Sequence, residues 1–429
     1  MGSSREASNG HGSTAPSPSR VRIVTDADST PWLDGLPEGA DPEQYEAGEC
    51  PWEKFARATH DTWGHRLNDV LVVSEHATMK GILSDRRFQQ GMHARIRRQA
   101  PDLDPRFVER RRDALLGREG PDHIRMRRIA SKSAFTPKAA NRHRPLMQQV
   151  MNDLADRIPD DGIYDAVQLV HDYPSTVIAQ VLGSRPDEVT AFSSTVGTIF
   201  DAQRGIPEAV PKAWDAIVQL DAHILDLVER KREQPGEDLI TDLLRAESED
   251  GVLSTQEVHD IAVAVVMAGT ETTRNALTRG LQLLAERPDI WQQLVDDDHL
   301  SAAVEEILRF APLAPLRRVP SEDLPVHDLL VPEGEVIVLD LGAANRDPEA
   351  FDDPDTFRID RAGSSKHFTL GHGHKYCLGA NLAKAEMVEA LRVLVGRFPR
   401  LEVAEPPVWS SKGQPRGQRV VLRFSSMQG

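Results

Sequence analysis

One short segment combines glycines and a cysteine at a spacing that suits a flat ligand. Residues 367–379 read HFTLGHGHKYCLG, so Gly371, Gly373, Cys377 and Gly379 follow the spacing G-x-G-x-x-x-C-x-G. The first two glycines permit a tight turn and a close approach of the backbone to that ligand. Because a helical pattern starts directly after Cys377, free amides and the helix dipole favour its thiolate. Gly379 leaves room where a macrocycle would press on the helix.

Two other interpretations of the cysteine remain open when the residues are considered alone. Cys377 could be a small buried apolar side chain, which is the commoner fate of a lone cysteine. It could instead bind zinc together with His367, His372 and His374, because these residue types suit that metal. The spacing matches no common zinc pattern, however, and zinc binding would leave the glycines unexplained.

A second segment, AGTETT at residues 268–273, puts a glycine and β-branched residues inside a long apolar helix. Gly269 alone costs ~1 kcal/mol in a helix interior. Such a conflict between local sequence and structure often marks a functional site. The plainer interpretation is that Thr272 bonds a carbonyl of its own helix and that Glu271 faces water.

Two pairs of polar residues each share one helical face. Glu306 and Arg309 stand three residues apart, and on an exposed surface such an ion pair is worth only ~0.3–0.5 kcal/mol. His123 and Arg127 stand four residues apart in PDHIRMRR. Their chemistry suits a carboxylate, which needs charge-assisted donors when it is partly buried. Taken singly, each of these residues would be an ordinary surface charge.

The elements that position these segments are mostly helices. Apolar residues recur at three- and four-residue spacing over residues 140–157, 163–182, 208–233 and 255–286. The last of these is apolar on all sides in its middle, which places it at the centre of a large protein. Strand patterns are few and short, at residues 67–73, 335–341 and 419–424. We therefore expect a mainly α fold with a small β-sheet region, in one compact domain over residues 21–429 after a disordered tail at residues 1–20.

The composition narrows the class of protein. The 429 residues carry a net charge of −16, which disfavours binding to nucleic acid or to an anionic membrane. Two cysteines, Cys50 and Cys377, cannot form a disulfide framework, so a reducing compartment is expected. No apolar run approaches the ~18 residues that span a bilayer. The N-terminal residues lack the apolar core of a secretory signal, so we expect a cytoplasmic protein.

The cysteine loop resembles the haem-binding loop of cytochromes P-450, and the other segments resemble that family in the expected order. The resemblance runs from about residue 50 to residue 424 and is closest to soluble actinobacterial members, through LRF, AANRDP and CLGANLA. It implies the cytochrome P-450 fold and a haem b cofactor, with the Cys377 thiolate as the axial ligand of the iron. It also implies that the haem propionates are bound by His123, Arg127, Arg318 and Lys375.

The resemblance assigns roles to the two remaining segments. Gly269 belongs to a groove for dioxygen, Thr272 hydrogen-bonds the bound peroxo group, and Glu271 relays protons. Glu306 and Arg309 are buried in the family and lock the core to the segment before the cysteine loop. The candidates for a third partner of this pair are Arg358, Arg361 and His372.

Two positions depart from the family pattern. Leu370 stands seven residues before the cysteine, where the family usually has Phe. The change removes a ring that shields the thiolate, and it bears on the reduction potential of the iron. Lys375 stands where His or Arg is usual, and a lysine meets a propionate without a planar fork. Neither change removes the predicted ligand.

The activity implied by the resemblance is that of a monooxygenase. It would be a monomer that oxidises a small, hydrophobic or natural-product-like substrate with electrons from a separate ferredoxin and its reductase. Because ferredoxins are acidic, docking needs a basic surface. The candidates for this surface, which could also be a plain solvated face, are Arg125, Arg127, Arg128, Lys132, Lys138, Arg142, Arg144, Lys375 and Lys384.

The walls of the substrate pocket are implied at residues 85–115, 190–210, 262–270, 313–317 and near Trp409. The first wall is rich in basic side chains, which either orient an acidic substrate, meet a carrier protein or are exposed charges. They are His93, Arg95, Arg97, Arg98, Arg106, Arg110, Arg111 and Arg112. The alternatives to a monooxygenase are a peroxide-driven or oxidative-coupling haem-thiolate enzyme, a haem-based sensor and a zinc-bound helical protein.

Overall fold

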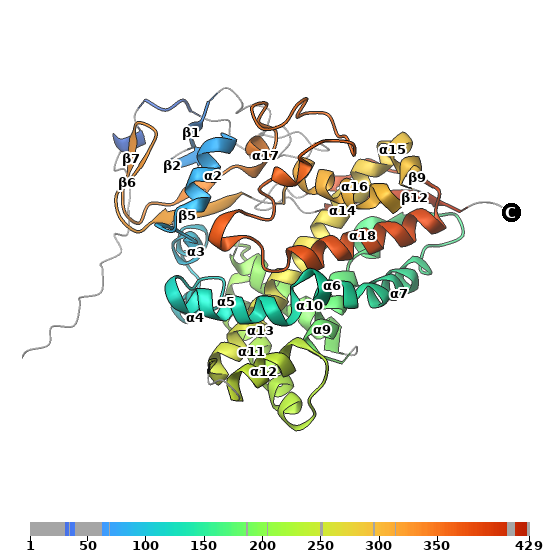
Figure 1. Cartoon of the computed structure of the whole chain (residues 1–429), viewed down its shortest axis with the longest axis horizontal. Helices are drawn as coiled ribbons and strands as arrows, with labels where there is room; N and C mark the ends of the chain where they lie inside the picture. The colour runs from blue at the N-terminus through green and yellow to red at the C-terminus, as the bar shows by residue number, and fades with distance from the viewer. Residues whose placement is uncertain are drawn as a thin grey trace, which may run out of the picture.

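The computed structural model describes residues 31–33, 35–38, 62–67, 69–185, 188–203, 205–248, 252–294, 297–313, 315–409 and 417–426. The tail predicted at residues 1–20 and Cys50 lie outside the described residues. Helices make up most of the molecule, and the largest sheet lies at one end of it (Figure 1). The prediction of a mainly α fold with a small β-sheet region is confirmed.

The helices follow one another through most of the chain. They are α2 (His76–Ser84), α3 (Met92–Gln99), α4 (Pro105–Asp113), α5 (Gly120–Ala134), α6 (Pro137–Arg142), α7 (Arg144–Ala155), α8 (Ala166–Leu169), α9 (Tyr173–Leu182), α10 (Val189–Gln203), α11 (Ala213–Glu233), α12 (Leu239–Ser248), α13 (Thr255–Gly269), α14 (Glu271–Ala285), α15 (Pro288–Gln293), α16 (Asp297–Phe310), α17 (Leu341–Ala344) and α18 (Ala380–Arg397). Short 3-10 turns are η1 (Pro31–Leu33), η3 (Val210–Lys212), η4 (Ser364–Lys366) and η5 (Gly373–Lys375).

The strands of the described residues form four small sheets. The largest has the order β1 (Gly64–Leu67), β2 (Val70–Val73), β8 (Ile337–Leu339), β5 (Leu316–Pro320) and β3 (Phe88–Gln89). In it β2 and β8 run parallel, and the other neighbours run antiparallel. The remaining sheets are β4 (Ile163–Asp165) with β12 (Val421–Ser425) and β9 (Arg400–Val403), β6 (Leu324–Val326) with β7 (Leu329–Val331), and β10 (Val408–Trp409) with β11 (Gly417–Arg419).

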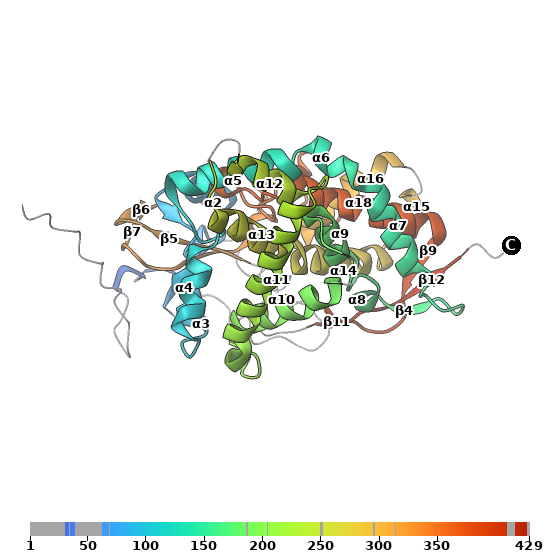
Figure 2. The same cartoon turned by 90° about the horizontal axis from the view of Figure 1, so that it is seen from below.

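The long central helix is interrupted. The prediction of one helix over residues 255–286 is wrong at Thr270, which separates α13 from α14 with φ −98° and ψ −68°. The start of α13 is well defined, because Ser254 and Glu257 form a reciprocal capping box. The end coincides with Gly269 and the β-branched residues that follow it, which are poor helix formers. Figure 2 shows α13 and α14 running through the middle of the molecule.

Three other predicted elements are also divided. Residues 163–182 contain β4, α8 and α9 rather than one helix. Residues 140–157 contain the end of α6 and all of α7, because Pro145 in the first turn of α7 cannot continue the preceding helix. Residues 67–73 form parts of two strands, since β1 and β2 pair antiparallel. In each case a local turn breaks an apolar pattern that reads as continuous.

The cysteine loop lies where two apolar cores meet. The larger core contains most buried residues of the helices, including those of α13, α14 and α18, and the smaller core lies around β2, β8 and α2. Phe368 belongs to the smaller core, whereas Leu370 belongs to the larger one, against which Cys377 also packs. The loop is therefore fixed from both sides by buried side chains.

Candidate functional site

The backbone of the cysteine loop explains its two central glycines. Gly371 and Gly373 have φ values of 74° and 66°, in the left-handed region that favours glycine. A Cβ atom on Gly373 would lie 2.4 Å from the carbonyl oxygen of Leu83 in α2. The amide of Cys377 donates to the carbonyl of Leu370 at 2.7 Å, which closes the loop. Any side chain at position 373 would push the loop away from α2.

The cysteine sits in a mixed electrostatic environment at the start of α18. Burial raises the pKa of the Cys377 thiol, whereas a hydrogen bond from Gly379 and the positive charges of Arg127 and Lys384 lower it. The helix begins at Ala380, directly after this turn. A Cβ atom on Gly379 would meet no protein atom within 4 Å, so a large ligand has space beside the sulfur.

Donor side chains predicted for a carboxylate-bearing ligand gather in one place. His123 of α5 and Arg318 of β5 are buried. Burial, followed by the charges of Lys375, Arg127 and His374, lowers the pKa of His123 to about 3. Burial also lowers the pKa of Arg318 to about 10. Burial, with the charges of Arg318 and Arg127, likewise lowers the pKa of Lys375, although Glu119 acts to raise it. Cations that disfavour one another's charge are the pattern expected where an anion is to be bound.

Two buried nitrogen atoms of this cluster have no hydrogen-bond partner among the described residues. They are Nε of Arg318 and Nδ1 of His374. Buried donors are normally satisfied, so such atoms call for an explanation. A bound carboxylate would supply the missing acceptors and the missing charge. The donors present therefore fit the propionates of a haem.

Arg127 and Lys375 also make contacts with protein atoms. Arg127 donates to the carbonyl of Tyr376, directly beside the cysteine. Lys375 donates to the carbonyl of Arg118 at 2.5 Å and pairs with Glu119 at 3.1 Å. Sequence reasoning missed Glu119, which lies just before the PDHIRMRR segment, and it considered His374 only as a candidate zinc ligand. The contact of Glu119 with Lys375 depends on how the start of α5 and the cysteine loop pack together.

The Glu306–Arg309 pair is completely buried. The two side chains are 0% exposed, and Nε and Nη2 of Arg309 donate to the carboxylate at 2.8 Å and 2.7 Å. The same carboxylate accepts from the Arg361 side chain at 3.2 Å and from the Arg358 backbone amide at 2.9 Å. Arg361 is therefore the third side chain of this cluster. The alternative of a weak surface pair is wrong.

Arg309 extends this cluster into the segment that precedes the cysteine loop. Its guanidinium donates to the carbonyls of Asn345, Pro354 and Thr356 at 2.9, 2.8 and 3.3 Å. Asn345 in turn accepts from the backbone amide of Phe368 at 2.8 Å. The buried charges thus connect α16 to the start of the loop that carries the cysteine.

The two candidate residues of the AGTETT segment lie in different surroundings, since Thr272 is exposed and Glu271 is buried. The Thr272 hydroxyl is exposed and donates to the carbonyl of Ala268 at 2.7 Å. Glu271 is buried and does not face water: it pairs with Arg274 at 2.6 Å, and Arg274 also donates to the carbonyl of His171. The second carboxylate oxygen of Glu271 is buried and has no hydrogen-bond partner among the described residues.

Gly269 lies against a neighbouring helix. A Cβ atom built on it would lie 2.4 Å from Cδ1 and 2.7 Å from Cγ1 of Ile178 in α9. Ile178 is itself buried. The glycine therefore permits the close approach of α13 to α9, a role that the sequence alone did not indicate.

The geometry does not support a zinc site. Nε2 of His367 lies 3.2 Å from Glu305, and His372 packs edge-on against Phe368. Over the described ranges, no three His, Cys, Asp or Glu side chains are grouped as metal ligands. The same part of the chain holds no helix that is both long and apolar enough to cross a bilayer.

The basic residues near α5 divide into two groups. Arg128, Lys132, Lys138 and Arg142 are exposed. The others are engaged with protein groups: Arg125 pairs with Glu257, Arg144 with Glu389, Lys375 with Glu119 and Lys384 with Glu305, and Arg127 bonds the Tyr376 carbonyl. Only the exposed group offers its charge freely to a partner protein.

Three arginines of the basic wall at residues 85–115 are paired with carboxylates. Arg106 pairs with Asp104 and lies over the Trp214 ring, and Arg112 pairs with Asp113. Arg110 bridges two other helices, because it contacts Asp221 of α11 and Asp260 of α13 at 3.0 Å each. Sequence reasoning missed both acids, which lie far from Arg110 along the chain. The side chains of His93, Arg95 and Arg98 lie outside the described residues.

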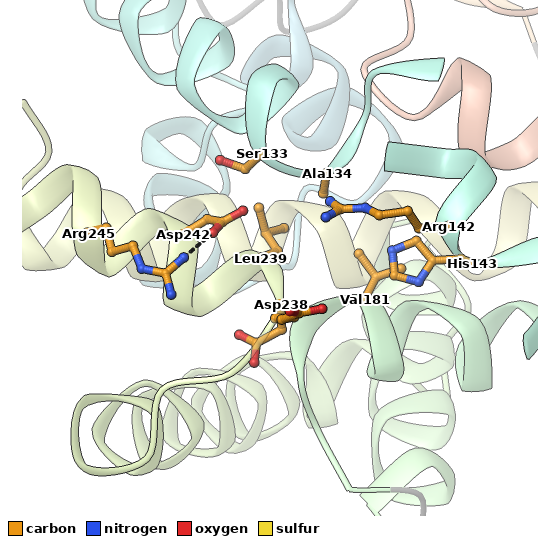
Figure 3. Close-up of a pocket in the computed structure, with 10 residues that line it drawn as sticks. Ser133, Ala134, Arg142, His143, Val181, Asp238, Leu239, Asp242 and Arg245 are labelled. Atoms are coloured by element: carbon orange, nitrogen blue, oxygen red, sulfur yellow. Dashed lines mark hydrogen bonds and ion pairs between the residues drawn. The ribbon is translucent and has the colours of Figure 1, made fainter. Parts of the chain in front are cut away.

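A separate surface pocket lies between α5, α6, α9 and α12 (Figure 3). Its volume is about 240 Å³, and Arg142 and His143 line it on one side while Asp238 and Asp242 line the other. None of the pocket's lining residues belongs to the cysteine loop or to the cationic cluster. The pocket is therefore distinct from the site described above.

Fold and site together fit a helical haem protein with a cysteine ligand, and comparison with known proteins gives the family. The Cytochrome P450 family model matches residues 62–414. Nocardicin C N-oxygenase of Nocardia uniformis subsp. tsuyamanensis is 33% identical over 345 residues, which cover 79% of this chain and 84% of that protein. Mycinamicin IV hydroxylase/epoxidase of Micromonospora griseorubida is 32% identical over 358 residues, covering 81% and 88%.

A solved structure shows the same architecture. The crystal structure of CalO2 superposes with a TM-score of 0.82 at 25% identity, covering 91% of this chain and all of that one. The chain belongs to the cytochrome P450 family and is a monooxygenase with a haem b cofactor. The predicted resemblance and the predicted cofactor are confirmed.

Proposed function

We propose that the Cys377 thiolate is the axial ligand of the haem iron and that His123, Arg127, Arg318 and Lys375 line the place of the propionates. The strongest support is the buried cationic cluster, in which Nε of Arg318 and Nδ1 of His374 have no hydrogen-bond partner among the described residues. Burial raises the pKa of the Cys377 thiol, and the amide of Gly379 and the charge of Arg127 act in the opposite direction, toward the thiolate. The glycine-bent loop and the open space at Gly379 leave room for the macrocycle.

The acid and the alcohol of AGTETT are proposed to manage protons for oxygen activation. The haem, when bound, supplies the iron at which dioxygen is bound and reduced. Thr272 presents its hydroxyl from the first turn of α14, next to the break at Thr270. Glu271 keeps one carboxylate oxygen for the Arg274 ion pair, and its second oxygen has no hydrogen-bond partner in the part of the chain that the structure describes. This second oxygen is the group that can accept and pass on a proton.

The intact pair favours use of dioxygen over use of peroxide, because a peroxide-driven reaction bypasses proton delivery. Thr272→Ala should raise the amount of peroxide released per electron consumed, whereas Thr272→Ser should stay close to the wild type. Peroxide release would be measured during turnover with a supplied electron donor. An unchanged release in Thr272→Ala would contradict the role of this hydroxyl.

The electron donor is proposed to be a separate acidic ferredoxin. Arg128, Lys132, Lys138 and Arg142 form an exposed basic surface on α5 and α6. Tyr376, which is 39% exposed, lies beside the cysteine and is bonded by Arg127 of the same helix α5. A donor that binds this surface would approach the sulfur over a short path. The charges would mainly steer the encounter of the two proteins.

The substrate is proposed to be a small natural product with a largely apolar skeleton. The relatives named above act on nocardicin C and mycinamicin IV, as their names state. Between Ile261 and Met267, α13 is lined with buried aliphatic side chains. Because Arg106, Arg110 and Arg112 are paired with carboxylates, the basic wall is less suited to an acidic substrate than its composition indicates.

The spectrum of the ferrous–CO complex tests the proposal directly. Thiolate ligation should place the Soret band at the long-wavelength position typical of this family. Cys377→His should move the band to the position of imidazole-ligated haem, with the helical content unchanged. A wild-type spectrum of the imidazole type, or protein that stays colourless after haem reconstitution, would refute the assignment of Cys377.

A further inference from the structure

The contact between Lys375 and Glu119 has no role in the function proposed so far. The Lys375 ammonium is almost fully buried, with its side chain 6% exposed, and lies 3.1 Å from the Glu119 carboxylate. It also donates to the carbonyl of Arg118 at 2.5 Å. The other oxygen of Glu119 accepts from the Gln90 amide at 2.8 Å. Two of the three N–H donors of Lys375 are thus used by the two residues that directly precede α5.

Glu119 is the carboxylate that stands inside a cluster of cations. Arg127, Arg318 and Lys375 are the positive groups of the predicted propionate site, and the charge of Glu119 acts on both Arg318 and Lys375. Three cations and one carboxylate leave two net positive charges. A haem b has two propionate carboxylates, so the charges of these residues and of the propionates cancel only when Glu119 is counted. A buried charge left uncompensated is costly.

We propose that Glu119 is a positioning residue that holds Lys375 in a neutral pair, so that Arg127, Arg318 and His123, rather than the lysine, carry the binding of the haem propionates. The proposal rests on the haem site proposed above. Glu119 also stands at the N-cap of α5 without capping it, since its side chain makes no hydrogen bond to the first turn. Its carboxylate is therefore available for the cysteine loop, and the pair ties that loop to the start of α5.

Removal of the two partners, singly and together, tests this pair. In haem-loaded protein, Lys375→Met should speed haem loss by about tenfold or more, because it leaves the half-buried Glu119 carboxylate without its ammonium partner inside the proposed propionate site. Glu119→Gln combined with Lys375→Met should return the rate to within about threefold of the wild type, because no uncompensated charge remains. Haem loss is measured as transfer to an excess of a haem-scavenging apoglobin, followed in the Soret band.

The single variant Glu119→Gln gives an independent readout. It leaves the positive charge of the Lys375 ammonium unpaired near the cofactor. The equilibrium between ferrous and ferric haem should therefore move toward the ferrous form by up to about tenfold, which is a rise of ~59 mV in the one-electron reduction potential. Asp122→Asn is the matched control, because it removes an exposed carboxylate from the first turn of α5, and its partner Arg125 keeps a second ion pair with Glu257. It should leave both the potential and the haem loss unchanged.

The outcomes separate this inference from the function on which it rests. If the double variant loses haem as fast as Lys375→Met, the lysine itself holds a propionate and the neutral pair is refuted. If Asp122→Asn shifts the reduction potential as much as Glu119→Gln does, the shift comes from the loss of any nearby negative charge, and the neutral pair is again refuted. If Lys375→Met does not fold, as judged by circular dichroism, the potential of Glu119→Gln decides. A wild type that binds no haem would instead overturn the proposed function.

Discussion

Substitution of Gly269 tests whether the glycine of the AGTETT segment is needed for binding dioxygen or for close packing of two helices. The sequence suggests a place in a groove for dioxygen, whereas the structure puts the missing side chain against Ile178 of α9. In Gly269→Ala, the new Cβ would lie 2.4 Å from Cδ1 and 2.7 Å from Cγ1 of a buried isoleucine. The isoleucine must therefore leave its rotamer or the two helices must separate.

The size of the effect follows from two opposing terms. Overpacking of a buried contact costs about 1–3 kcal/mol, while alanine in place of glycine gains at most ~1 kcal/mol of helix propensity. The gain is small here because Gly269 is the last residue of α13. Gly269→Ala should therefore lower the free energy of unfolding by about 1–2 kcal/mol. Urea unfolding of the haem-loaded protein measures this value.

A second variant makes the reasoning refutable. Ile178→Ala alone should cost about 2–5 kcal/mol, because it opens a cavity. It also removes both clashing atoms, since the remaining Cβ of residue 178 lies 3.9 Å from the new methyl group. The double variant should then be more stable than the sum of the single changes predicts, by about 0.5–3 kcal/mol. Strict additivity, together with increased peroxide release in Gly269→Ala, would show that the glycine serves the oxygen site instead.

Three further predictions concern charges. Glu306→Gln should destabilise the protein by about 3–5 kcal/mol, because Arg309 and Arg361 lose their buried counter-charge; an unfolding midpoint equal to that of the wild type would contradict this. Reversal of Arg128 and Lys132 to Glu should slow reduction by an acidic ferredoxin about tenfold at low salt, and reduction by dithionite should be unaffected. Burial lowers the pKa of His65 to about 4, so the folded protein favours the neutral imidazole. The resulting contribution to the free energy of unfolding is complete above pH 6.5, and up to about 3 kcal/mol of it is lost as the pH falls from 6.5 to 4. His65→Gln should flatten that part of the pH profile of urea unfolding, and an unchanged slope would show that His65 does not titrate there.

Apolar periodicity and short motifs in the sequence were enough to predict the class of fold and the segments that form the candidate site. The helices at residues 208–233 and in the first half of 255–286 were predicted close to their observed positions, because apolar periodicity and a capping box act within one element. The breaks at Thr270 and before Pro145 were missed, since an apolar pattern continues across them. The Glu306–Arg309 pair was found, but the choice of Arg361 as its third side chain needed the packing of a distant loop.

What the sequence determined by itself is the chemistry carried by contiguous residues: a cysteine on a glycine-bent loop before a helix, and an acid beside an alcohol. Spacing suffices there, because the chain itself fixes which atoms are close. Tertiary structure alone decided which charges far apart in sequence pair and why residue 269 is a glycine. Lys375 meets Glu119, and Arg110 meets Asp260, only because helices far apart in sequence pack together. Long side chains have several possible partners along a chain, and burial against one of them makes the choice.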